Sequence, residues 1–395
     1  MPATVTVDGI GLRKLLRGSG IVYRKWVRAP ANLPPGALVE ARSPRGETVG
    51  CGLWEPEGPV AIRVVEPGGC SYQTPGEAVE DRIARAYAAR RRAGLADTGS
   101  YRLVNSDGDL LSGLIVDVFA GQVAVLQSSS AAIDALLDQI VEAIVSTTGV
   151  EAVYEKSTQR SRRDIGLEPR KRWLKGRKPR VIVEEGQARF LVDVERGQKT
   201  GFYLDQRPNR LELEKLAVEG DRVLDVFSYT GAFGIHAALA GAREVTFLEE
   251  DPQAVEILRE NLRLNGISNY RIVASSIWRA EGVPRNYYTI VVVDPPAFIQ
   301  SGDPQAVERG VQAYRRAYRW AAERGAEEFL AYYSSCSYFL TREMFTRLVG
   351  EVLAPHDYRI LGSLRGAGPD HVLRGEEYLD YLKGAFIHVY KDSRS

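Results

Sequence analysis

The chain of 395 residues has few of the side chains that build metal clusters and disulfide frameworks: three cysteines, four histidines and two methionines. The cysteines are widely spaced, so they predict neither a disulfide framework nor a zinc site. So few histidines argue against a histidine-rich metal centre, and we expect no metal ion. The sequence also shows no N-terminal signal peptide and no apolar run long enough to span a bilayer. These absences favour a cytoplasmic protein.

Excess positive charge is absent over most of the chain, where acids outnumber bases, and is concentrated in one segment. The net charge is only +1, but residues 156–180 hold eleven lysines or arginines against two acids, a net of 11 − 2 = +9. Such a concentration is typical of a surface that faces a polyanion. A solvated loop is the alternative. The residues singled out here as candidate RNA contacts are Arg162, Arg163, Arg170, Lys171 and Arg172.

Residues 1–72 predict a small β-rich barrel. Short strand-like runs at 37–41, 50–54 and 60–65 are separated by proline and glycine, and one short helix is expected near 11–17. Basic and aromatic side chains interleave between residues 13 and 28; the basic ones include Arg13, Lys14, Arg24 and Lys25. This mixture suits RNA, because arginine binds phosphates and aromatic rings stack on bases. The same mixture also suits a half-buried barrel surface. On the evidence of this stretch alone, we favour the barrel surface.

Residues 73–186 predict a central α+β domain of ordinary size. A helix over 73–95 is followed by strands at 101–104, 114–119 and 123–127, with a hairpin turn at 119–122. Residues 131–145 predict one amphipathic helix, and short strands follow at 152–154 and 181–184. The apolar side chains of that helix recur at helical spacing and are expected in the core: Ile133, Leu136, Leu137, Ile140 and Ile144.

Residues 187–395 predict an α/β domain with a mainly parallel sheet. A helix over 209–216 is followed by strands at 223–226, 245–248, 290–293 and 329–333, with helices between them. Asp251 predicts an N-cap with Pro252 at the first helical position. Ligands of such sheets bind at the carboxyl ends of the strands. Four chemical signals fall there: the turn 225–231, Glu249, Asp294 and Cys336.

The stretch 221–251 predicts a nucleoside-binding strand, turn, helix and strand. Glu249 ends the second strand about twenty residues after the turn, where an acid can bind a ribose diol. Gly231 and Gly234 mark a place where the backbone approaches something closely. The turn Phe-Ser-Tyr-Thr-Gly lacks the G-x-G-x-x-G that a pyrophosphate needs. An adenosine ligand without phosphates fits better, which predicts S-adenosylmethionine.

Asp294 begins the sequence Asp-Pro-Pro-Ala-Phe directly after a buried strand. Prolines remove backbone donors and stiffen the chain, which would hold the Asp294 carboxylate and the Pro295 carbonyl against a flat base. Phe298 is expected to stack on the base or to shape the loop. A strand end without chemistry is the alternative that we weigh against this site.

Cys336 lies between Ser335 and Ser337 at another predicted strand end. Carbon 5 of a pyrimidine is a poor nucleophile, and a thiolate that adds to carbon 6 activates it for methyl transfer. Positive charge near a partly exposed cysteine would supply the thiolate. A small buried cysteine is the ordinary alternative, and it accounts for Cys51 and Cys70.

These motifs resemble those of the single-cysteine 23S ribosomal RNA cytosine-carbon-5 methyltransferases along nearly the whole chain. The family has an N-terminal PUA domain, a central α+β domain and a Rossmann-like class I methyltransferase domain. The matching stretches are Asp107–Leu110, Gly113–Asp117, Gly197–Arg207, Asp225–Gly231, Asp294–Phe298, Ser335–Ser337, Asp370–His371 and Tyr381–Lys383.

The resemblance implies roles for particular residues. Cys336 would be the nucleophile, and Asp294 would hydrogen-bond the cytosine ring. The implied cofactor site consists of Gln206, Arg207, Asp225, Phe227, Ser228, Tyr229, Gly231, Glu249, Ser276, Asp294 and Pro295. This chain has Ser275-Ser276 where the family places an acid near the adenine. It has no second cysteine in the Asp294 motif, so another group, such as water, must remove the carbon-5 proton.

The leading interpretation is an S-adenosylmethionine-dependent enzyme that forms 5-methylcytosine in large-subunit ribosomal RNA, with the target base single-stranded or flipped out. The barrel and the basic segment would grip flanking RNA through phosphates. The resemblance also suggests a homodimer. Transfer of the methyl group to a base nitrogen, which needs no cysteine, is the second interpretation. A non-catalytic RNA-binding assembly factor is the third, and transfer RNA stays open as the acceptor.

Overall fold

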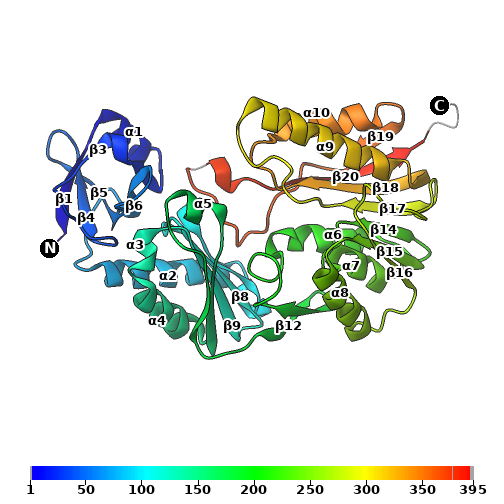
Figure 1. Ribbon diagram of the computed structural model, residues 1–395, viewed down its shortest axis with the longest axis horizontal. Helices are drawn as coiled ribbons and strands as arrows, with labels where there is room; N and C mark the ends of the chain where they lie inside the picture. The colour runs from blue at the N-terminus through cyan, green and yellow to red at the C-terminus, as the bar shows by residue number, and fades with distance from the viewer. Residues whose placement is uncertain (1, 376, 392–395) are drawn as a thin grey trace. The chain divides into compact units, whose positions relative to one another are not determined.

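The computed structural model describes residues 2–375 and 377–391, which form two compact units (Figure 1). The first unit comprises residues 1–183, 192–204 and 369–379, and the second comprises 184–191, 205–368 and 380–395. Each unit is described by itself below. Strands β12 (Arg180–Glu185) and β13 (Ala188–Asp193) form a two-stranded sheet. The chain passes from unit one to unit two within β12, after residue 183, and returns to unit one within β13, at residue 192.

The first part of unit one is the expected β-rich barrel. Its six-stranded sheet has the order β2-β6-β5-β4-β1-β3 and packs around Val5, Val39 and Val64. Asp8 caps the short helix by accepting hydrogen bonds from the Ile10 and Gly11 N–H groups. The elements are β1 Ala3–Val7, α1 Gly9–Leu16, β2 Ile21–Tyr23, η1 Arg24–Trp26, β3 Val27–Arg28, β4 Leu38–Arg42, β5 Thr48–Trp54 and β6 Val60–Pro67.

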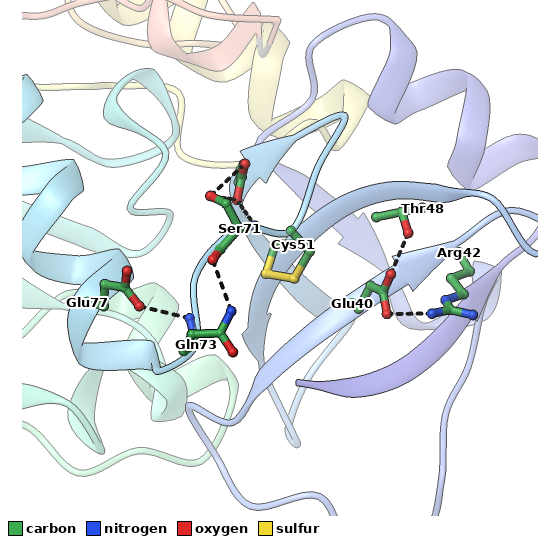
Figure 2. The surroundings of a disulfide bond; sticks show 9 residues. Glu40, Arg42, Thr48, Cys51, Ser71, Gln73 and Glu77 are labelled. Carbon is green, nitrogen blue, oxygen red and sulfur yellow. Dashed lines mark hydrogen bonds and ion pairs between the residues drawn. A yellow bond between two sulfur atoms is a disulfide. The ribbon is translucent and has the colours of Figure 1, made fainter. Parts of the chain in front are cut away.

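A disulfide between Cys51 and Cys70 corrects the prediction that the cysteines do not pair. Cys51 lies opposite Glu66 in the β5–β6 ladder, and the chain turns back after β6, so the two Cα atoms come within 4.7 Å. Figure 2 shows the disulfide and the loop that follows it, where the Ser71 N–H donates to the Glu66 carboxylate at 2.7 Å. The Pro67-Gly68-Gly69 sequence signals a turn, but it does not show that this turn brings Cys70 beside Cys51, 19 positions away.

The rest of unit one is the expected α+β part, with a five-stranded sheet in the order β11-β10-β9-β8-β7. The predicted hairpin turn is confirmed, with Ala120 and Gly121 at positive φ and the Gln122 N–H donating to the Phe119 carbonyl at 3.0 Å. The elements are α2 Pro75–Arg92, η2 Ala96–Thr98, β7 Tyr101–Asn105, η3 Ser106–Asp109, β8 Leu114–Phe119, β9 Val123–Ser128, α3 Ala131–Asp134, α4 Leu137–Thr148, β10 Ala152–Ser157, α5 Arg160–Asp164 and β11 Arg170–Lys175.

The single helix predicted over 131–145 is wrong in one respect, because the chain forms two helices, α3 and α4. The Leu136 N–H donates to the Ile133 carbonyl at 3.0 Å, which tightens the turn and ends α3. Leu136 itself has non-helical dihedral angles and precedes the first residue of α4. All five apolar residues predicted for the core of this segment are nevertheless buried.

Unit two contains a seven-stranded sheet in the order β16-β15-β14-β17-β18-β20-β19, which confirms the Rossmann-like α/β fold. All its strands run parallel except β20, which lies antiparallel between β18 and β19. The order reverses between β14 and β17, the position at which open α/β sheets bind ligands. The strands are β14 Arg222–Val226, β15 Glu244–Glu249, β16 Tyr270–Ala274, β17 Tyr288–Val293, β18 Gly325–Ser335, β19 Asp357–Ile360 and β20 Lys383–Tyr390.

Helices cover both faces of this sheet: α9 and α10 lie on one side and α6, α7 and α8 on the other (Figure 1). Asp251 caps α8 through the Gln253 N–H at 2.9 Å, with Pro252 at the first position, as predicted. On the α9–α10 side, a buried core that includes the aromatic residues Tyr314, Tyr318 and Phe345 packs against the sheet. The helices are η4 Leu204–Gln206, α6 Arg207–Leu216, α7 Ala232–Leu239, α8 Pro252–Leu264, α9 Pro304–Ala322 and α10 Arg342–Leu353. The short helix η5 Glu377–Leu379 belongs to unit one. Within the described residues, no helix is both long and apolar enough to cross a membrane.

Candidate active site

The four strand-end signals predicted from the sequence lie on adjacent strands of unit two. Val226 pairs with Leu248 of β15 and with Val293 of β17, and Val293 pairs with Tyr333 of β18. The turn after β14, the acid at the end of β15, Asp294 and Cys336 therefore share one edge of the sheet. This edge includes the reversal of strand order, so the sheet provides one site there.

The turn after β14 is conformationally strained. Phe227 and Tyr229 have positive φ angles of 61° and 51°, which costs a non-glycine residue about 1 kcal/mol or more each. The N–H groups of Phe227 and Ser228 donate to the Leu248 carbonyl, which ties the turn to β15. Among the described residues, the buried hydroxyls of Ser228 and Thr230 find no hydrogen-bond partner. Unpaired buried hydroxyls call for a polar ligand, so the turn fits the nucleoside part of S-adenosylmethionine.

The two glycines of this region approach protein atoms closely. A Cβ atom at Gly231 would lie 2.2 Å from Leu258 of α8, and one at Gly234 would lie 2.3 Å from Phe247 of β15. Gly231 also has a φ angle of 86°, which side chains rarely adopt. The close approach predicted from the sequence is therefore explained by packing of the α7 start against α8 and of α7 against the sheet.

Glu249 ends β15 as predicted and accepts three backbone hydrogen bonds. The Tyr229 N–H donates to Oε2 at 2.8 Å, and the Glu250 and Asp251 N–H groups donate to Oε1 at 2.9 and 2.8 Å. Burial raises the pKa of Glu249, and these three donors oppose the shift. Oε1 already accepts two of these bonds, whereas Oε2 accepts one. The second lone pair of Oε2 can therefore still accept from a ribose hydroxyl.

Asp225 lies at the base of the turn and has only 1% of its surface exposed. Its Oδ2 accepts the Gly234 N–H at 2.9 Å and so holds the first turn of α7. Burial, helped by the charges of Asp294 and Glu249, raises the pKa of Asp225 to about 8. The side chain stabilises the turn, and direct contact with the cofactor stays a prediction.

Gln206 and Arg207, both predicted at the cofactor, have their side chains in protein networks. Gln206 Nε2 donates to Asp294 Oδ1 at 2.8 Å, while its Oε1 accepts from Tyr332 Oη at 2.9 Å and from Asn209 Nδ2 at 2.6 Å. Arg207 Nε donates to Glu185 at 3.2 Å. Glu185 also pairs with Arg210, in an ion cluster behind the site. Gln206 therefore positions Asp294.

Asp294 follows β17 directly. Ser334 Oγ donates to its Oδ1 at 2.5 Å, the same oxygen that accepts from Gln206. Burial raises the pKa of Asp294 to about 6; the Asp205 charge adds to the shift, while the Ser334 and Gln206 hydrogen bonds oppose it. Since both donors reach Oδ1, Oδ2 is the oxygen that a proton would occupy. A carboxyl group that titrates near neutral pH can donate a proton to a base nitrogen.

Cys336 lies beside the Asp294 motif. Its Sγ is 3.9 Å from the Pro295 carbonyl oxygen, and it takes no part in a disulfide. Phe298 packs edge-on against Phe227, with ring centroids 6.1 Å apart, and against Tyr314 at 4.8 Å. The aromatic side chain thus lies between the Asp294 motif and the cofactor turn, as expected of a residue that shapes the loop.

Ser275 and Ser276 follow β16, next to the strand that ends at Glu249. Ser276 Oγ accepts from Arg279 Nε at 3.3 Å, and Ser275 Oγ donates to the Ser276 carbonyl at 3.3 Å. The serines therefore stand at the strand end that the resemblance assigns to an adenine contact. No acidic side chain replaces them in the sequence 275–278.

The basic candidate RNA contacts all belong to unit one. Some of them bind other protein groups, and some are exposed. Arg162 is fully buried and makes a two-bond ion pair with Asp134 at 2.7 and 2.9 Å, so its assignment to RNA is wrong. Arg24 donates to the Gly58 and Val60 carbonyls, so it supports the barrel. Arg170 and Arg172 pair with Glu155, which cancels part of the positive charge. The exposed candidates are Arg13, Lys14, Lys25, Arg163, Lys171 and Arg172.

Sequence reasoning missed three residues around the reacting centre. Ser334 holds Asp294, and Tyr314 Oη lies 2.8 Å from the Ser337 hydroxyl beside Cys336. Lys383 Nζ donates to the Ser337 carbonyl at 2.6 Å. Lys383 belongs to a stretch that the resemblance had marked, Tyr381–Lys383, but nothing in the sequence places that stretch beside the cysteine.

Comparisons with known proteins agree with this geometry. Residues 109–329 match the S-adenosylmethionine-dependent methyltransferase family, and residues 5–67 match the PUA-like domain. Ribosomal RNA large subunit methyltransferase I of Aeromonas hydrophila is 32% identical over 401 residues, with 95% of this chain and 97% of that protein covered. The protein of the same name from Pseudoalteromonas atlantica is 32% identical over 412 residues, with 98% and 100% covered.

A solved structure shares the fold along the whole chain. The crystal structure of SMU.776 complexed with SAH has a TM-score of 0.80 and 22% identity, and the match covers 98% of this chain and 100% of that one. The cofactor of this family is S-adenosylmethionine, and the strained turn after β14 suits it. The chain therefore belongs to the S-adenosylmethionine-dependent methyltransferases, in the family that includes the ribosomal RNA large subunit methyltransferases.

Proposed function

We propose that this enzyme forms 5-methylcytosine in large-subunit ribosomal RNA, with Cys336 as the nucleophile. The observation that carries the proposal is the position of Cys336 Sγ, 3.9 Å from the carbonyl of Pro295, the residue that follows Asp294. Transfer to a base nitrogen or to a ribose oxygen needs no thiol. A thiol outside any disulfide, at the same sheet edge as a carboxyl of raised pKa, suits attack on a pyrimidine ring.

Cys336 and Asp294 have different roles in methyl transfer to carbon 5. When bound, S-adenosylmethionine supplies an electrophilic methyl group. The Cys336 thiolate forms a bond to carbon 6 of the cytosine while Asp294 donates its proton to ring nitrogen 3, so the ring electrons gather at carbon 5. After carbon 5 takes the methyl group, its proton leaves to a base such as water. The carbon 5–carbon 6 double bond re-forms, the thiolate departs, and nitrogen 3 returns its proton to Asp294.

The RNA would be held by unit one. The PUA-like domain carries exposed Arg13, Lys14 and Lys25, and β11 and the α5 region add Arg163 and Lys171. Phosphate contacts by such side chains give affinity without sequence specificity. The relatives' names place their action on large-subunit ribosomal RNA, which supports the same acceptor and a cytoplasmic site of action here. A homodimer, which the sequence resemblance suggests, stays part of the proposal; light scattering of the purified protein tests it.

The competing function is methylation of a base amine, which Asp-Pro-Pro motifs also serve. In this chain Ala297 separates the prolines from Phe298, whereas many amino methyltransferases place the aromatic residue directly after the prolines. The positioned thiol gives amine transfer no advantage, so this candidate has no specific observation in its favour.

Nucleoside mass spectrometry of a large-subunit ribosomal RNA transcript, treated with the enzyme and methyl-labelled S-adenosylmethionine, tests the proposal. We expect label in 5-methylcytidine with the native enzyme and none with Cys336→Ala, while calorimetry shows that the variant still binds S-adenosylmethionine. Label in an N-methylated base, or undiminished 5-methylcytidine with Cys336→Ala, would contradict the proposal.

A further inference from the structure

We propose that Lys383 is the positive charge that holds Cys336 as a thiolate, an inference that rests on the proposed function of Cys336 as nucleophile. Lys383 is the first residue of β20, in the one antiparallel strand of the sheet. It acts on the sulfur rather than on the substrate, so it is a positioning residue. The thiolate is the reactive form of a cysteine, and an ammonium group fixed close to the thiol favours that form.

The β18–β20 ladder fixes the lysine beside the cysteine. Lys383 is the direct cross-strand partner of Ser335, the residue before Cys336. Its Nζ donates to the carbonyl of Ser337, the residue after Cys336, at 2.6 Å. The side chain thus runs past Cys336, with its backbone paired on one side and its amine bound on the other. A second hydrogen bond, to the Tyr381 carbonyl at 2.6 Å, fixes the amine further.

The surroundings explain why this amine can influence a thiol. Lys383 has only 1% of its surface exposed, so its field is poorly screened by water. Burial lowers the pKa of Lys383 to about 8, and the Cys336 charge opposes that shift. The two hydrogen-bonded carbonyls use two of the three ammonium protons. A nearby anion stabilises the charged lysine, and by the same interaction the charged lysine stabilises the thiolate.

Other ionisable groups face the pair from every neighbouring element. Tyr314 and Tyr318 of α9 feel the Cys336 charge, and burial raises the pKa of Tyr314 to about 12, so both phenols stay neutral. Asp294 lies on the β17 side, and its negative charge disfavours a thiolate. Asp380 and Arg342 act on Lys383 with opposite signs and pair with each other at 2.7 Å. Arg342 is thus paired with Asp380, whereas the hydrogen bonds of Lys383 within the described residues go to backbone carbonyls.

Alkylation of the thiol by iodoacetamide tests this role without RNA. With Cys51 and Cys70 joined, Cys336 is the free thiol of the folded chain, so the added mass reports on it alone. The alkylation rate of the native protein is measured from pH 5.5 to 10 and compared with Lys383→Gln, which keeps an N–H donor but loses the charge, and with Lys383→Arg, which keeps the charge. Calorimetry with S-adenosylmethionine shows that each variant retains its fold.

We expect half-maximal alkylation of the native protein below the ordinary cysteine value of about 8.5. Lys383→Gln should move the midpoint up by about one pH unit or more, and Lys383→Arg should return it towards the native value. A one-unit rise lowers the thiolate fraction at pH 7 about tenfold. It also increases the intrinsic reactivity of the thiolate about threefold, so the plateau rate rises while the rate at pH 7 falls about threefold.

A native midpoint at or above 8.5 overturns the inference, even if no variant folds. An unchanged midpoint in Lys383→Gln, or an equal shift in Lys383→Arg, does the same. The outcome is separable from the proposed function: a shifted midpoint with no 5-methylcytidine formed leaves the ion pair intact and refutes the methylation chemistry. An unshifted midpoint with active enzyme refutes only the role of Lys383.

Discussion

Ser334→Ala is expected to move the ionisation of Asp294 without disturbing the sheet. The Ser334 hydroxyl donates to Asp294 Oδ1 at 2.5 Å and lies fully buried at the end of β18. A hydrogen bond to a charged group contributes about 1.5–3 kcal/mol, and one pKa unit corresponds to about 1.4 kcal/mol. Loss of this donor to the carboxylate should therefore raise the pKa of Asp294 from about 6 by about one to two units.

This shift has a predictable effect on the pH profile. If the neutral carboxyl donates to cytosine nitrogen 3, kcat/KM for RNA methylation falls as pH rises through the pKa of Asp294. The falling limb should move from near pH 6 to about pH 7–8 in Ser334→Ala. At pH 7 the protonated fraction rises from about one in eleven to between about one half and nine tenths. Initial rates at subsaturating RNA across pH 5–9 measure the limb.

Ser337→Ala is the matched control, because it removes a hydroxyl three residues away that bonds to Tyr314 and to the Ile299 N–H but not to Asp294. Its falling limb should stay near the native position, whatever its absolute rate. A stationary limb in Ser334→Ala, or an equal movement in Ser337→Ala, would refute the assignment of this limb to Asp294.

Four further predictions concern the rest of the chain. Replacement of both Cys51 and Cys70 by serine should lower the free energy of unfolding by about 3 kcal/mol, since the disulfide closes a loop with a sequence separation of 19; urea unfolding measures this, and no change would show that the bond does not form in solution. Arg162→Met should cost about 3 kcal/mol of stability, because it breaks a buried ion pair while Asp134 keeps its pair with Arg170 at 2.9 Å. Lys171→Ala should leave stability within about 0.5 kcal/mol and weaken RNA binding with a shallower salt dependence; the opposite pattern in filter binding and urea unfolding would reverse the two roles. Because the pKa of Asp225 is raised to about 8 in the fold, its contribution to stability is greatest at low pH and declines as pH rises. Between pH 6 and 8 the ionisation of Asp225 should lower the free energy of unfolding by about 2 kcal/mol. Asp225→Asn, which keeps an acceptor for Gly234, should lack this decline. Parallel plots of the free energy of unfolding against pH for the two proteins would contradict the raised pKa of Asp225.

Much of the fold is readable from local sequence because short-range chemistry sets it. The Asp251–Pro252 helix start and the 119–122 hairpin depend on residues only a few positions apart. The four strand-end signals could be grouped because parallel strands bring their carboxyl ends to one edge. The sequence resemblance then supplied candidate roles for Asp294 and Cys336, and the structure places both at the ends of adjacent strands, with Cys336 Sγ 3.9 Å from the Pro295 carbonyl oxygen.

Features that depend on distant partners were not readable. Gln206 binds Asp294 across 88 positions, and Lys383 reaches Ser337 across 46. Neither pairing leaves a periodic pattern. Arg162 was taken for a surface cation because its acidic partner, Asp134, is 28 residues away. The insertion of β20 between β18 and β19 brings Lys383 to the site, and only the strand order reveals it.

Trapping of the covalent adduct tests the cysteine mechanism most directly. In a large-subunit ribosomal RNA transcript that contains 5-fluorocytidine, the methylated target has no proton at carbon 5 for a base to remove, so the bond from Cys336 to carbon 6 should persist. We expect a denaturant-stable protein–RNA adduct, dependent on S-adenosylmethionine, whose mapped attachment site is Cys336. The adduct should be absent with Cys336→Ala, although that variant still binds the RNA. A native enzyme that methylates the unmodified transcript but forms no such adduct, or an adduct that survives Cys336→Ala, would contradict covalent catalysis by this cysteine.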